Sequence, residues 1–600
     1  MKRIIGVILA AVIMVALPFI FRKPPEAGVW REGDPVLVVV TPHNEAIRQE
    51  FADGFSAWHE RHYGRPARVD WRNIGGTTEI MRYLASEYIG SMEGWWERQG
   101  RHWPANGGSV ILSATPPAIP DDADAAAREK ALAEREIYFA FRTNDSPEVA
   151  TARIDLFFGG GVFDHSDAER KGLTVRPWPT DADIPVGIFK DARGVELVPR
   201  ELSGETCRSD IFFGNVLSTF GICLNPDRLR DLGFEADALP DSWAGLADPR
   251  LFGNVGVTDP TKSGSVAKAF EMIVQQTMTE HMHAAGWTEE AISSNETAIA
   301  ATGKRVGEGD LAGYQADMAA GWEEGLNLIR LIGANARYFT DSAGKVPIDV
   351  GMGATAAGIC IDFFGRFQAE YTRTADGQPH MTYVTPKGGS CVSADPISLL
   401  RGAEHRELAV RFIEFVFSVE GQRLWNTKVG APGGPRKFAL RRLPIRRDFY
   451  PSDDPVFNAA AATNALDSSD DLASPDINPF TLADTFTYRP RWSGRHFGVQ
   501  RDLVRALCLD SGDELRVAWK AIIDHGGPDA NPEAMALLRK LPTKPVPVTW
   551  ESAVTDYRKI PRLQYMREWT AEMRANYRTA ERIATATNID VERGDGATRP

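Results

Sequence analysis

The sequence predicts an α/β protein with a doubly wound strand and helix pattern and two or more folding units, followed by a mainly helical C-terminal extension. The first observation is a repeated order of short apolar strand, polar or glycine-rich turn and amphipathic helix. The second is the length of 600 residues, which is far more than one hydrophobic core needs. The third is a shift in composition after about Tyr450, beyond which helical stretches predominate.

The first unit begins at residues 36–40, an uninterrupted apolar run typical of a buried parallel strand. Thr41-Pro42-His43-Asn44 follows, and apolar residues then recur at helical spacing as far as Trp58. A second short strand at 69–71 leads into Gly75-Gly76-Thr77-Thr78, which opens another helix. Doubly wound sheets bind ligands beyond the carboxyl ends of their strands, so both turns are candidate ligand contacts.

The order of strand and helix breaks at residues 90–142, which are rich in Trp, Gly, Pro, Asp and Ala and are expected to form a surface insertion. A strand at 154–158 followed by Gly159-Gly160-Gly161 restores the order. Later apolar runs and helical spacing predict strands at 211–224, 356–364 and 398–400, and helices at 125–136, 322–332, 406–417, 503–525, 533–541 and 561–584.

The most informative stretch is residues 254–275, where a strand, a polar turn and a helix follow one another. This arrangement aims free backbone N–H groups and the positive end of the helix dipole at one point. Hydroxyls of Thr261, Ser263 and Ser265 and the flexible Gly264 lie in the turn. The pattern predicts an anion-binding corner, and the alternative is an ordinary turn whose Ser or Thr caps the helix.

Hydroxyl-bearing and small residues, together with helix N-termini, recur at successive predicted strand ends. This combination favours a small, oxygen-rich ligand. We expect no catalytic residue, metal site or cofactor, because the sequence has no GxSxG, Walker A or HExxH motif. An alternative is an enzyme that uses His43 and Asp362 as an acid–base pair. The candidate ligand-binding residues are His43, Asn44, Gly76, Thr77, Thr78, Gly160, Gly161, Thr261, Ser263, Gly264, Ser342 and Asp362.

Charge and the N-terminal segment bear on the compartment. The net charge of −13 argues against broad nucleic-acid binding. Residues 4–21 are apolar and follow two basic residues, so 1–25 is expected to be an uncleaved membrane anchor, or alternatively a cleaved signal peptide, with the remainder exported. In an oxidising compartment, Cys207 with Cys223, or Cys360 with Cys391, are plausible disulfides, and the odd total of five leaves one cysteine over.

Eight segments follow one another along the chain, namely VVVTPHNEAIRQEF, DWRNIGGTTEIMRYL, DLFFGGGVFD, STFGICLNPDRL, LPDSWAGLADPRLFGNVGVTDPTKSGS, GWEEGLNLIRLIGANARYFTDS, YVTPKGGSCVSADPISLL and FIEFVFSVEGQRLW. Taken in this order, they resemble the extracytoplasmic solute-binding proteins of ABC importers, in particular the group that binds ferric iron or phospho-compounds. The resemblance implies a type II periplasmic-binding-protein fold that closes on its ligand. It further implies a monomer that delivers a small anion, such as a phosphorylated or phosphonate compound, to a membrane permease from the periplasmic side.

Carried onto this chain, the resemblance places 35–164 and 393–450 in lobe 1, 165–392 in lobe 2 and 451–600 in a helical extension. Ferric-binding members use a histidine after the first strand, which His43 matches, and an adjacent tyrosine pair. Here the pair reads Phe363-Phe364, and Phe has no oxygen to offer a metal. A phosphate-like anion is therefore preferred to iron. The alternatives are binding of ferric iron, free or chelated, and a membrane-tethered ligand-sensing module.

Overall fold

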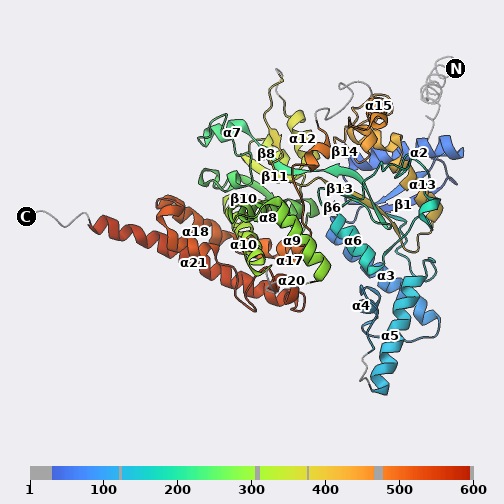
Figure 1. The fold of residues 1–600 in the computed structure, drawn as a ribbon, viewed down its shortest axis with the longest axis horizontal. Coiled ribbons are helices and arrows are strands. Elements are labelled where there is room, and N and C mark those ends of the chain that lie inside the picture. The colour runs from blue at the N-terminus through green and yellow to red at the C-terminus, as the bar shows by residue number, and fades with distance from the viewer. Residues whose placement is uncertain (1–29, 120–123, 304–310, 374–376, 465–476, 595–600) are drawn as a thin grey trace, which may run out of the picture.

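The computed structural model describes residues 30–119, 124–303, 311–373, 377–464 and 477–594. It confirms the predicted α/β class with a mainly helical C-terminal region, because two separate mixed sheets are each covered by helices. Figure 1 shows the two sheets side by side, with the C-terminal helices on the side away from strand β1.

The first sheet has the strand order β14-β7-β13-β3-β1-β2, and β4 pairs with β13. Strand β1 runs parallel to both β2 and β3, as expected of a doubly wound unit, while β13 is antiparallel to its neighbours. The strands are β1 (Val36–Val40), β2 (Arg68–Arg72), β3 (Leu156–Phe158), β4 (Thr174–Val175), β7 (Phe212–Ser218), β13 (Ser393–Leu400) and β14 (Leu443–Pro444), and the helices that follow them are α2 (Glu45–Tyr63), α3 (Thr77–Arg98), α6 (Val162–Lys171), α13 (Arg406–Phe417) and α14 (Val419–Asn426).

The second sheet has the order β10-β9-β11-β8-β12. Strand β9 pairs in parallel with β10 and β11, and β8 is antiparallel to β11 and β12. The strands are β8 (Phe220–Leu224), β9 (Val255–Thr258), β10 (Ala336–Thr340), β11 (Ala357–Ile361) and β12 (Thr382–Val384), and the helices include α7 (Pro226–Asp231), α8 (Gly264–Ala284), α9 (Glu289–Thr302), α10 (Ala312–Asn335), α11 (Lys345–Gly351) and α12 (Asp362–Tyr371).

The chain crosses between the sheets at Thr219, which separates β7 from β8, and again between β12 and β13. Strands β4 and β7 fall in the range predicted for lobe 2, yet both pair with β13 in the first sheet. The eight-residue β13 is long enough to pair with β3, β4 and β7. We therefore propose that the lobe boundary lies at Thr219 rather than at residue 165.

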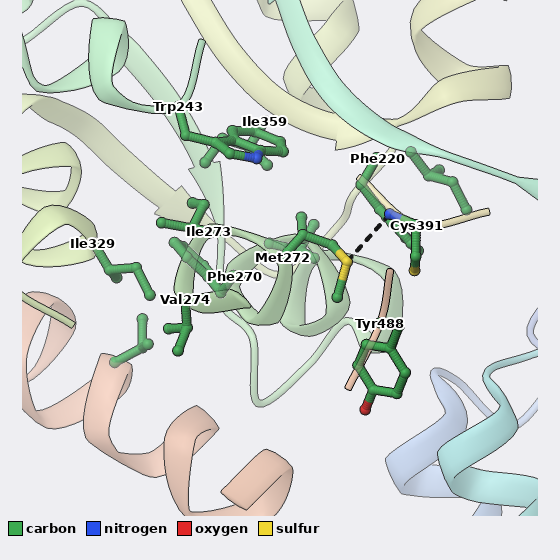
Figure 2. Close-up of a cluster of buried hydrophobic side chains, with 14 of the residues drawn as sticks. Phe220, Trp243, Phe270, Met272, Ile273, Val274, Ile329, Ile359, Cys391 and Tyr488 are labelled. Atoms are coloured by element: carbon green, nitrogen blue, oxygen red, sulfur yellow. Dashed lines mark hydrogen bonds between the residues drawn. The ribbon is translucent and has the colours of Figure 1, made fainter. Parts of the chain in front are cut away.

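Helix α8 forms the centre of the largest hydrophobic core, and Figure 2 shows its surroundings. Phe270, Ile273 and Val274 on the helix are fully or almost fully buried. Side chains from both flanks complete the core, including Trp243, Ile329 on α10 and Ile359 on β11. Tyr488, which belongs to the C-terminal extension, packs into the same cluster, so the extension is part of this core.

The predicted insertion forms an arm that projects from the first lobe (Figure 1). Helix α3 continues to Arg98, so the insertion begins later than residue 90. The arm contains α4 (Gly107–Ile111) and α5 (Ala125–Thr143), of which α5 is longer than the predicted 125–136. Tyr88, Ile137 and Phe141 join it to a second core beneath β1 and β3.

The C-terminal extension packs its helices on one another and on α10 of the second lobe. Trp519 is buried and its Nε1 donates a hydrogen bond to Asn335 Oδ1 at 2.8 Å. Arg330 of α10 is also fully buried and donates to the Leu538 carbonyl. The helices are α15 (Pro455–Asn464), α16 (Pro479–Ala483), α17 (Phe497–Val504), α18 (Gly512–Asp524), α19 (Pro532–Arg539), α20 (Ser552–Thr555) and α21 (Arg562–Gly594), with a π-helical turn at Arg505–Leu509.

Two predictions from the sequence concern the N-terminal anchor and the disulfides. The predicted anchor, residues 1–25, lies outside the described residues; within them, no helix is long and apolar enough to cross a membrane. All five cysteines are buried free thiols. The structure does not bring together the predicted pairs but places Cys223 Sγ 3.1 Å from Cys360 Sγ, because β8 and β11 are neighbours.

Candidate functional site

A cavity of about 2670 Å³ lies between the lobes, where the predicted strand-end turns meet. Its walls come from the turns after β1, β2 and β3, the start of α8, the turn after β10 and the C-terminal extension. Nine of the twelve predicted ligand residues line it, namely His43, Asn44, Gly76, Thr77, Gly160, Gly161, Ser263, Gly264 and Ser342. Their role in ligand binding stays a prediction.

Three helix N-termini open at one end of this cavity. Helices α3 and α6 begin after Gly76 and Gly161. Because glycine has no side chain, the first backbone N–H groups of both helices have no N-cap side chain as acceptor. Helix α8 begins after Ser263, whose hydroxyl accepts a hydrogen bond from Val266 N. The positive ends of three dipoles and unused N–H donors make this end of the cavity favourable for an anion.

Gly264 shows how closely these termini approach one another. A Cβ added to Gly264 would lie 3.1 Å from Thr77 Oγ1 on α3 and 3.6 Å from Asp164 Oδ2 on α6. Gly76 is similarly close to the other lobe, since a Cβ there would lie 2.7 Å from the Lys262 carbonyl oxygen. The lobes therefore approach closely here, and at Gly76 the approach is backbone to backbone, which leaves no room for a Cβ.

Asp164 is a lining residue that the sequence reasoning missed. It sits in the first turn of α6 and is almost fully buried. Burial raises the pKa of the carboxyl, although nearby Arg501 and the Thr77 hydroxyl act in the opposite direction. A protonated Asp164 could donate a hydrogen bond to an oxyanion, whereas an ionised one would repel it. An acidic residue in a helix's first turn was the only signal in the sequence.

His43 lies at the end of β1 and is held by a buried ion pair. Its Nε2 is 3.3 Å from Arg442 Nη1 and 3.7 Å from Asp395 Oδ2, and Arg442 pairs with Asp395 at 2.6 Å. Burial lowers the pKa of His43 against the opposing effect of Asp395 and so favours the neutral ring, and Nε2 is the ring nitrogen that faces both Arg442 and Asp395. No spacing pattern in the sequence marks Arg442 or Asp395 as partners of this histidine.

Arg442 joins the crossover strands to the wall of the second lobe. Its Nη2 donates to Ser218 Oγ at the end of β7, and its guanidinium lies 4.6 Å from the centre of the Phe363 ring. Phe363 and Phe364, which replace the tyrosine pair of ferric-binding proteins, line the cavity as apolar surface. A guanidinium beside His43 also places positive charge where a metal cation would have to bind.

Three predicted ligand residues do not line the cavity. Asp362 turns back towards the crossover, where its Oδ2 accepts a hydrogen bond from Thr219 N at 3.0 Å. Thr78 Oγ1 accepts one from Arg501, and Thr261 Oγ1 donates to Asp259 Oδ1 at 2.7 Å. The predictions that these residues contact ligand are therefore not supported by their positions, because each hydroxyl or carboxyl already has a partner within the chain.

A buried charged cluster also lines the cavity. Lys268 Nζ lies 2.6 Å from Glu205 Oε1 and 2.8 Å from Glu271 Oε2. The hydroxyls of Tyr488 and Ser493 in the extension donate to Glu271 Oε1. Burial by itself lowers the pKa of Lys268, but the two carboxylates outweigh it and hold the pKa well above its ordinary value. This ammonium is thus committed to its two carboxylates.

Comparison with known proteins bears on the class of the chain. Residues 183–450 match the family model of bacterial extracellular solute-binding proteins, which confirms the resemblance predicted from the sequence. An uncharacterized protein of Haemophilus influenzae is 22% identical over 273 residues, which cover 45% of this chain and 60% of that relative. The match therefore spans less than two thirds of the relative's length. The extension, from 451 onwards, lies outside the matched family segment.

Two solved structures are also similar. One is the periplasmic binding protein AfuA from Actinobacillus pleuropneumoniae with bound fructose-6-phosphate, at 16% identity over 65% of this chain and 81% of that chain, with a TM-score of 0.39. The other is iron-bound HitA from Pseudomonas aeruginosa, at 13% identity over 78% of this chain and 99% of that chain, with a TM-score of 0.41.

Proposed function

We propose that the protein is the solute-binding component of an ABC importer, which captures a small oxygen-rich anion between its lobes and delivers it to a membrane permease. The ligand class is a phosphorylated or phosphonate compound, or another oxyanion. The observation that carries this proposal is the meeting of three helix N-termini at one end of the interlobe cavity, two of them without a side-chain cap.

We further propose that the protein acts by binding alone and on the periplasmic side of the membrane. The acid–base pair considered from the sequence gains no support, because His43 lines the cavity whereas Asp362 is bonded to Thr219 behind it. Neutral His43 is itself fixed by Arg442. The match to an extracellular family supports export, and a tether through residues 1–25 remains a prediction for residues outside the described ones.

A thermal-shift screen of residues 26–600 tests the proposal, because a ligand that binds the folded state raises its melting temperature by mass action. The compounds are sugar phosphates, aminoalkyl phosphonates, phosphate, sulfate, polyamines and ferric citrate. We expect a rise with a phosphorylated or phosphonate compound. A rise with ferric citrate alone, or with none of the compounds, would contradict the proposal.

The variant Gly161→Ala tests whether the anion binds at the N-terminus of α6. The new Cβ would have ordinary contacts, 3.8 Å from Asp164 Oδ2, and would project at the start of α6 without backbone strain. We expect the affinity for the anion to fall about tenfold, which corresponds to about 1.4 kcal/mol. Gly90→Ala is the matched control, since a Cβ there meets nothing within 4 Å and Gly90 does not line the cavity. Equal affinities of the two variants would place the anion elsewhere.

A further inference from the structure

The C-terminal extension reaches the mouth of the cavity at the place where the two lobes meet. Helix α17 packs on α8 and α10 of the second lobe. Side chains of α17 also contact helices α3 and α6 of the first lobe. Residues 487–497 and 550–559 contribute lining residues to the cavity, although they lie outside the matched solute-binding family segment.

Arg501 of α17 contacts both lobes with one guanidinium. On the second lobe, Nε donates to the Pro260 carbonyl at 2.7 Å and Nη2 to the Thr261 carbonyl at 3.3 Å. On the first lobe, the same Nη2 donates to Thr78 Oγ1 at 2.6 Å, in the first turn of α3. A planar guanidinium holds several acceptors in fixed directions, so these bonds fix the distance between the two turns.

An aromatic contact lies beside this guanidinium. Phe497, at the start of α17, packs on Phe163 in the first turn of α6, with ring centroids 4.7 Å apart. Phe497 is almost fully buried. The extension thus grips the first lobe at the N-termini of both α3 and α6, which are two of the three termini that face the predicted anion.

Direct contact between the lobes at this place is weaker. Lys262 Nζ lies 3.6 Å from Glu79 Oε1, and the Lys262 side chain is 46% exposed, so water and salt screen this pair. The backbone of Gly76 also approaches Lys262, which resists closer packing. Elsewhere the lobes contact each other directly, through Lys268 with Glu205 and through Arg441 with Glu370. Beside the helix N-termini, Arg501 and Phe497 add contacts from α17 to α3 and α6.

We propose that the C-terminal extension is a clasp, with Arg501 as the positioning residue, that keeps the two lobes in their closed arrangement around the cavity. The lobes would then be closed even without ligand, and ligand would not be the only cause of closure. This consequence for ligand binding rests on the proposed function. In population terms, the clasp stabilises the closed state before ligand binds.

The distance between the two lobes, measured without ligand, shows whether the clasp holds them closed. Spin labels on cysteines introduced at Arg82 of α3 and Glu323 of α10, both exposed, report on opposite lobes of residues 26–600. We expect one narrow distance distribution in the ligand-free protein. Arg501→Ala should add a second population at longer distance, and Arg501→Lys, which keeps a donor, should restore part of the narrow one.

Arg505→Ala is the matched control. Arg505 lies one turn further along the chain and contacts only the second lobe and its own helix, with Nη1 3.1 Å from Asp259 Oδ2. Its removal should leave the distance distribution unchanged. Thr78→Val is the milder second variant, since it removes only the first-lobe acceptor and leaves the arginine in place; it should broaden the distribution in the same direction as Arg501→Ala.

Unchanged distributions in both Arg501→Ala and Thr78→Val, measured on folded protein, would overturn the clasp. Equal broadening in Arg505→Ala would overturn it too, because the effect would then not depend on contact with the first lobe. These outcomes are distinguishable from failure of the transport proposal, which the thermal-shift screen decides on ligand binding alone.

Discussion

At the scale of single residues, the buried Asp164 makes stability depend on pH. Because burial raises its pKa, the folded state binds more protons than the unfolded state as the pH rises from the unfolded pKa to the folded pKa. Stability from this group is therefore complete at low pH and decreases through that window. The carboxyl that faces the predicted anion thus destabilises the fold when it is ionised.

Asp164→Asn tests this dependence. We expect a higher melting temperature than the wild type at pH 7 to 8, with the difference shrinking at low pH, where the wild-type carboxyl is protonated. Melting curves across pH check it. Asp167→Asn is the control, since Asp167 on the same helix pairs with Arg170 and Lys171 near the surface; the same pH profile in both variants would remove the assignment to Asp164.

The Arg442–Asp395 pair is a second prediction at this scale. Arg442→Met would leave the Asp395 carboxylate, whose side chain is 18% exposed, without its main partner, and we expect a loss of about 1–3 kcal/mol of unfolding free energy. Urea unfolding measures the loss. Adding Asp395→Asn to the variant should recover part of it; a double variant that is no better than Arg442→Met would show that the charge was not the cause.

The cysteines provide a test of export. In protein folded in an oxidising compartment, we expect the neighbouring Cys223 and Cys360 thiols to transfer two electrons to a disulfide-bearing oxidant, lose two protons and form a bond. Thiol titration of that protein, unfolded in guanidinium chloride, should find three thiols instead of five. Cys223→Ser folded in the same compartment should show four, and five thiols in the exported wild type would contradict the prediction.

At the scale of elements, local pattern predicted α8 well and its surroundings less well. The apolar spacing of residues 266–274 marked the buried core of the observed helix, and the alternative role of Ser263 as a cap is what the structure shows. Thr261, in contrast, was expected to face ligand. Its carbonyl and hydroxyl are instead contacted by Arg501 and Arg505, about 240 residues later in the chain. No local pattern carries such a contact.

At the scale of the whole molecule, repeated strand-turn-helix units predicted a doubly wound fold with a ligand site at the strand ends, and the family resemblance added the two lobes. The position of the extension could not be predicted, because it depends on fit between surfaces far apart in the chain. Two fully buried polar side chains of α10, Arg330 and Asn335, form hydrogen bonds with the extension's Leu538 and Trp519. The extension is therefore part of the fold and not a separate domain.

Truncation after residue 450 tests this conclusion. It would expose the apolar face of α10 to water and remove the bonds that Arg330 and Asn335 make with Leu538 and Trp519. We expect the truncated chain to aggregate or to lose cooperative unfolding, as measured by size-exclusion chromatography and calorimetry. A soluble, cooperatively unfolding fragment would show that the extension is dispensable for folding.

The two sheets also differ in how much of the chain must exist before they can form. The second sheet uses only strands between residues 220 and 384, whereas the first needs β1 at its start and β13 and β14, which end at Leu400 and Pro444. During synthesis or export from the N-terminus, the second lobe can complete its pairing while the first still lacks its central strand. The N-terminal strands of the first lobe therefore stay incompletely paired until β13 and β14 have been synthesised or exported.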